Sequence, residues 1–139
     1  MKFSTMTAAL LAGVAAAATE NVDISDLTVR KTSGEPTTIQ SVSFKLKGDD
    51  ADGLACEASN PAFPSEVITC GESKYRFVIS AGEPADESEF GLRVYHELGT
   101  AVGSTGFGNV PTYCRAGGAG PNDFVCQQTG AATIVATTA

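Results

Sequence analysis

Hydrophobic and polar side chains alternate along several segments of this 139-residue chain, and this spacing constrains the fold more than any other feature. From 41 to 47, Val42, Phe44 and Leu46 alternate with serine and lysine, as in a half-buried strand. The same period recurs over 74–79 and over 90–98. In the latter, one face carries Phe90, Leu92, Val94, His96 and Leu98. Because no segment after residue 18 keeps a 3.6-residue apolar period over three turns, we expect an all-β fold.

Shorter candidate strands lie between segments with strong turn signals. We expect them over 24–31, 54–59, 66–69, 100–102 and 132–137. Glycine, proline and aspartate mark turns at 33–36 and 48–53, residues 82–89 form an acidic connector, and the glycine-rich residues 103–108 predict a flexible connection or a bulged strand. Many short strands without a linker or repeat predict one small antiparallel barrel or sandwich.

The first residues have the pattern of a secretory signal peptide. Lys2 gives a positive start, residues 6–14 are apolar, and residues 15–18 are four alanines typical of a cleavage region. The apolar run is shorter than the roughly 20 residues of a membrane-spanning helix. We therefore expect cleavage after Ala17 or Ala18, with a signal peptide over 1–18 and a single domain over 19–139.

The charge of the chain argues against two classes of partner. The net charge is −7, and removal of Lys2 with the signal peptide makes it −8. Nucleic acids and anionic membranes both attract clusters of lysine and arginine, and the sequence has no such cluster. We expect an acidic, soluble, secreted protein that binds neither.

Four cysteines in a small secreted chain predict a disulfide framework, for which three pairings are possible. An even number leaves no thiol for a covalent dimer, so we expect a monomer or a non-covalent homodimer. A zinc site is the competing interpretation. The chain lacks a Cys-x-x-Cys motif and has one histidine, which argues against zinc.

The segment between Cys114 and Cys126 has no helical or strand pattern of its own. It contains three glycines and one proline among eleven residues. A cross-link between the two cysteines would restrict the unfolded chain and stabilise the fold by about 3 kcal/mol. The segment also carries Arg115, Asn122, Asp123 and Phe124, so it is a candidate recognition surface.

Residues 113–127 read Tyr-Cys-Arg-Ala-Gly-Gly-Ala-Gly-Pro-Asn-Asp-Phe-Val-Cys-Gln and resemble the signature of the fungal Alternaria major-allergen (AA1-like) family. The resemblance continues over 41–47, at Cys56 and over 70–72. It implies a β-barrel with the disulfide pairs Cys56–Cys70 and Cys114–Cys126. It also implies a secreted protein, because that family contains allergens and elicitors of plant defence, with relatives described as binders of thaumatin-like plant proteins.

Several residues have side chains that could take part in catalysis or metal binding, but none lies in a pattern that predicts a catalytic, metal or cofactor site. His96 alternates with apolar residues and has no Gly-x-Ser-x-Gly nucleophile, so a structural, hydrogen-bonded role is expected. The Asp49–Gly53 turn lacks the glutamate of an EF-hand and predicts a solvated hairpin turn. The acidic side chains of the connector also look solvated, which argues against a glycosidase pair; these are Glu83, Asp86, Glu87 and Glu89.

Two functions remain. The first is a non-enzymatic fungal effector or elicitor in the host apoplast that binds a plant protein through Tyr113, Arg115, Asn122, Asp123 and Phe124. Aromatic and arginine side chains dominate binding hot spots, although the segment could equally serve only to close the barrel. The alternative is a carrier that encloses an apolar or phenolic ligand within the barrel, with an interior lined by Phe44, Phe77, Phe90 and Leu92.

Overall fold

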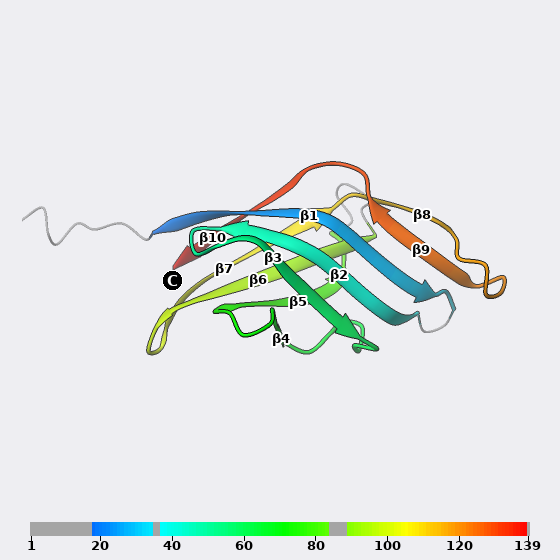
Figure 1. Cartoon of the computed structure of the whole chain (residues 1–139), viewed down its shortest axis with the longest axis horizontal. Coiled ribbons are helices and arrows are strands. Elements are labelled where there is room, and N and C mark those ends of the chain that lie inside the picture. The colour runs from blue at the N-terminus through cyan, green and yellow to red at the C-terminus, as the bar shows by residue number, and fades with distance from the viewer. Residues whose placement is uncertain (1–17, 35–36, 84–88, 139) are drawn as a thin grey trace, which may run out of the picture.

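The computed structural model describes residues 18–34, 37–83 and 89–138, and ten strands make up its regular structure (Figure 1). Residues 1–17 of the predicted signal peptide and residues 84–88 of the acidic connector lie outside the described residues. The strands are β1 (Thr19–Thr32), β2 (Thr38–Gly48), β3 (Ala51–Ser59), β4 (Ile68–Thr69), β5 (Tyr75–Ala81), β6 (Phe90–Gly99), β7 (Val102–Val110), β8 (Thr112–Ala116), β9 (Asp123–Gln128) and β10 (Ala132–Thr138).

The strands form one antiparallel sheet in the order β3-β2-β1-β10-β7-β6-β5-β4, with the β8–β9 hairpin attached to β1. Strand β1 has a different neighbour along each half of one edge. Its first half pairs with β10, from Thr19 opposite Thr137 to Ile24 opposite Ala132. Its second half pairs with β9, from Thr28 opposite Gln127 onward. The hairpin thus lies at one end of the molecule, as Figure 1 shows at the right.

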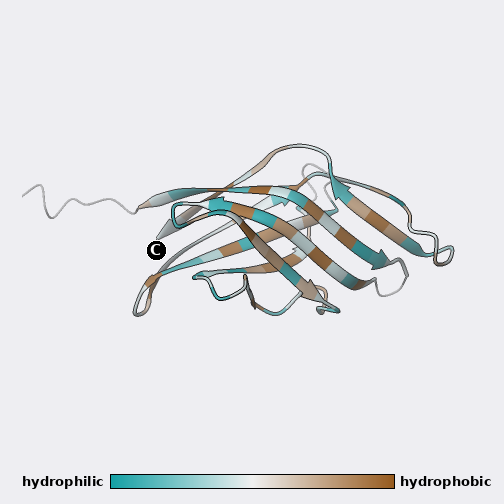
Figure 2. Ribbon diagram, viewed as in Figure 1, coloured by the Kyte–Doolittle hydropathy of each residue, from teal (hydrophilic) through white to brown (hydrophobic). Residues whose placement is uncertain are grey.

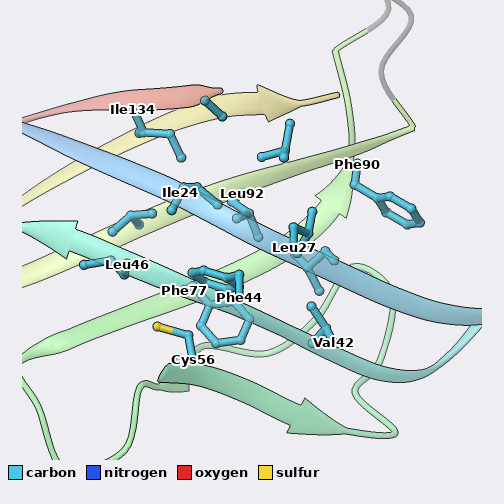
Figure 3. Close-up of a cluster of buried hydrophobic side chains, with 14 of the residues drawn as sticks. Ile24, Leu27, Val42, Phe44, Leu46, Cys56, Phe77, Phe90, Leu92 and Ile134 are labelled. Atoms are coloured by element: carbon cyan, nitrogen blue, oxygen red, sulfur yellow. The ribbon is translucent and has the colours of Figure 1, made fainter. Parts of the chain in front are cut away.

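A disulfide connects the two edges of the curled sheet. Cys56 of β3 is bonded to Cys70, which follows β4, with 4.4 Å between their Cα atoms. Behind it, Phe44 and Phe77 meet edge to face with ring centroids 4.9 Å apart (Figure 3). The expected all-β fold is therefore confirmed as a nearly closed antiparallel barrel, and so is this disulfide pair, which the family resemblance implied.

The alternation of apolar and polar residues along the strands determines which side chains fill the barrel. Polar and apolar residues alternate along β1 and β2 in Figure 2, and the apolar face is buried. The core includes the residues expected from the period-two pattern, among them Val42, Phe44, Leu46, Phe77, Ile79, Phe90, Leu92 and Val94. Leu98 was expected to share this face, but it is 46% exposed. The pairing register shifts between Glu97 and Gly99, so the alternation ends before Leu98.

Residues 103–108 were expected to form a flexible connection or a bulged strand, and they form a strand without a bulge in this segment. Residues 103–108 belong to the regular strand β7, which pairs with β6 along its length. A Cβ atom at Gly108 would lie 2.9 Å from Ile134 Cγ1, so the missing side chain lets β10 pack closely across β7. Two short strands were placed inaccurately, because only Ile68–Thr69 of 66–69 is extended and β7 begins at Val102.

The part of the chain that the structure describes contains no helix with the length and hydropathy of a membrane span.

Candidate partner-binding site

The segment from 113 to 127 is a hairpin, not the irregular loop that its composition predicted. Strands β8 and β9 pair in register, with Tyr113 opposite Gln127 and Arg115 opposite Val125. Cys114 and Cys126 are directly opposite each other and form the second disulfide, with Cα atoms 3.9 Å apart. The pairing implied by the family resemblance is confirmed. All four cysteines are paired, so no thiol remains for an intermolecular bond.

Asp123 organises the turn of the hairpin. Its backbone carbonyl accepts a hydrogen bond from the Gly117 N–H at 2.8 Å, and its carboxylate accepts one from the Ala119 N–H at 3.0 Å. Gly118 and Gly120 have φ values of 95° and 150°, a region that favours glycine. The glycines therefore allow the turn, and Asp123 fixes it.

Arg30 of β1 donates hydrogen bonds to the same carboxylate. Its Nη2 lies 2.6 Å from Asp123 Oδ2 and its Nε 3.1 Å from Oδ1, and Nη2 also reaches the Gly117 carbonyl at 3.4 Å. The hydrogen bonds from Arg30 hold the pKa of Asp123 below its ordinary value, despite the opposing effect of desolvation. Asp123 is only 6% exposed. Asp123 was expected to contact a partner, and the engagement of its carboxylate within the chain argues against that role.

Lys31 fixes the inner side of the hairpin. It is 7% exposed and forms an ion pair with Glu89. Its ammonium lies 5.9 Å from the ring centroids of both Phe90 and Phe124. Phe124 is consequently half-buried against Lys31, and little of its ring remains for a partner.

The opposite side of the hairpin carries the exposed residues. Tyr113 is 67% exposed, and Arg115, two residues along the same strand, lies on the same face. Arg115 Nη2 donates a hydrogen bond of 2.7 Å to Oε1 of Gln127, the residue opposite Tyr113 in the hairpin. Asn122 is exposed on the turn. Three of the five expected contact residues, Tyr113, Arg115 and Asn122, are thus accessible.

Sequence reasoning missed Arg30, Lys31 and Gln127. Arg30 and Lys31 belong to β1. Arg30 is 93 residues from Asp123 in the sequence, and no local sequence pattern predicts a contact over that separation. Gln127 lies beside the second cysteine of the motif. Its position opposite Tyr113 follows only from the hairpin register.

A second polar cluster surrounds His96 inside the other end of the barrel. His96 Nδ1 lies 2.7 Å from Glu20 Oε1, and the Tyr75 hydroxyl donates to Glu20 Oε2 at 2.5 Å. His96 Nε2 is 2.8 Å from Asp50 Oδ2, though without the angles of a hydrogen bond. The imidazole stacks on Tyr75 at 4.1 Å. The expected inward, hydrogen-bonded His96 is confirmed.

Two pKa values are shifted within this cluster. Burial alone would raise the pKa of Glu20, but hydrogen bonds from Tyr75, the Asp49 N–H and His96 together hold it below the ordinary value. Burial, together with donation to Glu20, raises the pKa of the Tyr75 hydroxyl. The cluster therefore contains an ionised carboxylate that is fully hydrogen-bonded, which is the arrangement of a structural support.

One group of potential metal ligands comes together among the described residues. It consists of Glu89, Cys114 and Cys126, and both sulfurs are bonded to each other. Because metals bind the thiolate form of cysteine, this group does not fit a metal. Asp49 and Asp50 connect β2 to β3, so the predicted hairpin turn is confirmed.

Comparison with known proteins identifies consistent relatives. The family model described as Alternaria alternata allergen 1 matches residues 24–126. "Effector protein PevD1" of Verticillium dahliae is 61% identical over 116 residues, covering 84% of this chain and 70% of that protein. "Major allergen Alt a 1" of Alternaria alternata is 32% identical over 107 residues, covering 75% and 64%. A crystal structure of Alt a 1 superposes with a TM-score of 0.66 at 31% identity, covering 85% of this chain and 88% of that chain.

Proposed function

Because the chain belongs to the Alternaria alternata allergen 1 family, we propose that it is a secreted fungal effector that acts without catalysis by binding an extracellular protein of the host plant. The relative named as an effector matches 84% of this chain at 61% identity, which supports a shared role. The described residues supply a barrel and exposed side chains. The imidazole of His96 contacts Glu20 and Asp50, and the hydroxyl of Ser104, which lies opposite His96, has no hydrogen-bond partner, so His96 is not bonded to this hydroxyl.

The observation that carries the proposal is the exposed face of the β8–β9 hairpin. Tyr113 and Arg115 project from a two-stranded element that is fixed by a disulfide, by the Arg30–Asp123 pair and by buried Lys31. A surface that is already ordered loses little conformational entropy on binding. An exposed tyrosine beside an arginine combines large contact area with directed hydrogen bonds, the composition typical of hot spots.

A capture experiment from leaf apoplastic fluid tests the proposal, with the oxidised protein as bait. We expect one plant protein to dominate, and a thaumatin-like defence protein is the first candidate to look for. Tyr113→Ala and Arg115→Ala should each weaken its binding by about tenfold or more. Melting temperatures should stay close to that of the unmodified protein, since both side chains are exposed.

Lys45→Ala provides the control, because Lys45 is an exposed cation on β2, outside the hairpin. It should bind like the unmodified protein. Equal binding by all three variants would remove the hairpin face from the proposal, and failure to capture any plant protein would remove the host-protein partner.

The carrier alternative receives no support from the barrel interior. Phe44, Phe77, Phe90 and Leu92, which were expected to line a ligand space, instead belong to one buried core and are at most 2% exposed (Figure 3). These side chains occupy the volume that an enclosed ligand would need.

A further inference from the structure

A hollow of about 380 Å³ lies beside the turn that joins β6 to β7, where it is lined by residues at the ends of β5, β6 and β7 and borders the buried His96 and Ser104. Its walls include Lys74, Arg76, Tyr95, Glu97, Val102 and Thr105. In Figure 1 this turn is at the left end of the barrel, whereas the β8–β9 turn is at the right end. The hollow is therefore separate from the hairpin face.

The cations around this hollow are not equivalent. Arg76 Nη2 is paired with Glu97 Oε1 at 2.9 Å, so those two charges offset each other. No carboxylate lies within ion-pair distance of the Lys74 ammonium among the described residues. The backbone at Lys74 is fixed, because its carbonyl accepts a 2.9 Å hydrogen bond from the Glu97 N–H. The walls of the hollow thus carry one more positive than negative side chain, with the surplus charge on Lys74.

The remaining walls combine apolar surface with one available hydroxyl. Tyr95 is half-buried, and Val102 is 54% exposed. Arg93 Nη1 donates a 3.2 Å hydrogen bond to Thr105 Oγ1, which leaves the hydroxyl proton of Thr105 free to donate to a bound molecule. An apolar wall with a few polar groups is typical of small-ligand sites, and the volume falls near the lower end of their range of about 300–1,000 Å³.

Three other hollows lack this combination. One is lined by Asp23 and Asp26 without a cation, and another has Glu57 as its one charged lining residue. A third contains Arg30, whose guanidinium is already paired with Asp123. An anion with an apolar body therefore fits the hollow beside Lys74 better than it fits these three.

We propose that the hollow beside Lys74 binds a small aromatic carboxylate. The carboxylate lies against the Lys74 ammonium, the ring packs on Tyr95 and Val102, and a ring hydroxyl or carboxylate oxygen accepts from Thr105. This inference does not depend on host-protein binding, because the hollow and the hairpin face share no residue.

Titration of the ¹⁵N-labelled, oxidised protein with 4-hydroxycinnamate tests this site by NMR. We expect saturable shifts of the backbone amides at 74–76 and 95–105, with the hairpin amides unaffected. The methyl ester of the same acid has no negative charge and should bind about two- to fivefold more weakly, the effect of one exposed charge pair. Lys74→Gln should weaken binding of the acid by the same factor and leave binding of the ester unchanged.

Lys47→Gln is the matched control, since Lys47 is an exposed lysine on β2 outside the hollow, and it should bind the acid normally. The proposal is overturned if millimolar 4-hydroxycinnamate causes no saturable shifts, if the shifts lie elsewhere, or if Lys74→Gln binds the acid as tightly as the control does.

Discussion

Glu20 is a buried carboxylate with a hydrogen-bond partner on each oxygen, and this arrangement predicts a pH dependence of stability. Its pKa in the folded protein lies below the ordinary value of 4.5. Its stabilising contribution is therefore fully present above about pH 4.5 and is lost as the pH falls through the lower, folded-state pKa. We expect Glu20→Gln to be less stable than the unmodified protein at pH 7, and the difference in melting temperature to shrink below pH 4.5.

Thermal unfolding from pH 7 to pH 2 measures this difference. Glu57→Gln is the control, because Glu57 is an exposed glutamate of β3 and should follow the unmodified protein throughout. A gap between Glu20→Gln and the unmodified protein that stays constant with pH would contradict the role given to Glu20.

For a single buried polar residue, the sequence does not reveal which other residue it bonds to. Alternation predicted that His96 faces inward, and it does. Glu20 lies on the same buried face of β1 as Val22 and Ile24. A period-two pattern, however, carries no information about a contact with a residue 76 positions away. For the same reason Asp123 was expected to be accessible, because its pairing with Arg30 depends on two strands that meet only in the folded barrel.

At the scale of the element, the irregular middle of β1 makes the fold possible. The strand bulges between Ser25 and Thr28, where Asp26 has a φ of 57°, and there its neighbour changes from β10 to β9. The Gln128 side chain accepts from the Leu27 N–H at 3.0 Å and donates to the Ile24 carbonyl at 2.9 Å. One amide side chain thus replaces the ladder hydrogen bonds that the bulge interrupts.

We predict that Gln128→Ala lowers the free energy of unfolding by about 1–3 kcal/mol, because it leaves these backbone groups without their partner. Urea denaturation with a constant m value measures the change. Gln40→Ala is the matched control, since the Gln40 amide bonds to Thr32 in an exposed position and its loss should cost less than about 0.5 kcal/mol. Equal losses in the two variants would show that the bulge does not depend on Gln128.

Strands with a clear apolar period were predicted well, whereas β7 and the β8–β9 hairpin were predicted less well. In β7, glycine supplies no side chain to the pattern, and β8 and β9 have only 5 and 6 residues, so periodicity cannot detect these strands. What makes these segments extended is their pairing with β6, β10 and β1, together with the close approach that Gly108 allows. These are properties of the assembled sheet and not of the local sequence.

For the whole molecule, the Cys56–Cys70 disulfide replaces the hydrogen bonds that a fully closed barrel would have between its edges. We expect Cys56→Ala/Cys70→Ala to lose about 2–4 kcal/mol of unfolding free energy, because the unfolded chain gains freedom and the two edges are no longer tied. Chemical denaturation measures this loss. A double variant as stable as the unmodified protein would show that packing of Phe44 on Phe77 suffices to hold the edges together.

Strand patterns predicted a small antiparallel barrel or sandwich, and the choice of the barrel came from the family resemblance. Local patterns could not make this choice, because closure depends on which strands become neighbours. Here, the contact between Phe44 and Phe77 and the disulfide beside it bring the two ends of the sheet together. The hairpin face, with Arg115 and Gln127, is likewise a product of register.

The position of β1 between early and late strands has a consequence for biogenesis. β1 leaves the ribosome before the other strands, but one of its edges pairs only with the late strands β9 and β10. This edge also includes a hydrogen bond from the Thr133 hydroxyl to the Asp23 carboxylate, across 110 residues. Contacts of such sequence separation slow folding, since a long loop must close before they form. The nascent chain therefore exposes one unpaired edge of a half-hydrophobic strand until β9 and β10 have been translated, and chaperones can bind this edge during that interval.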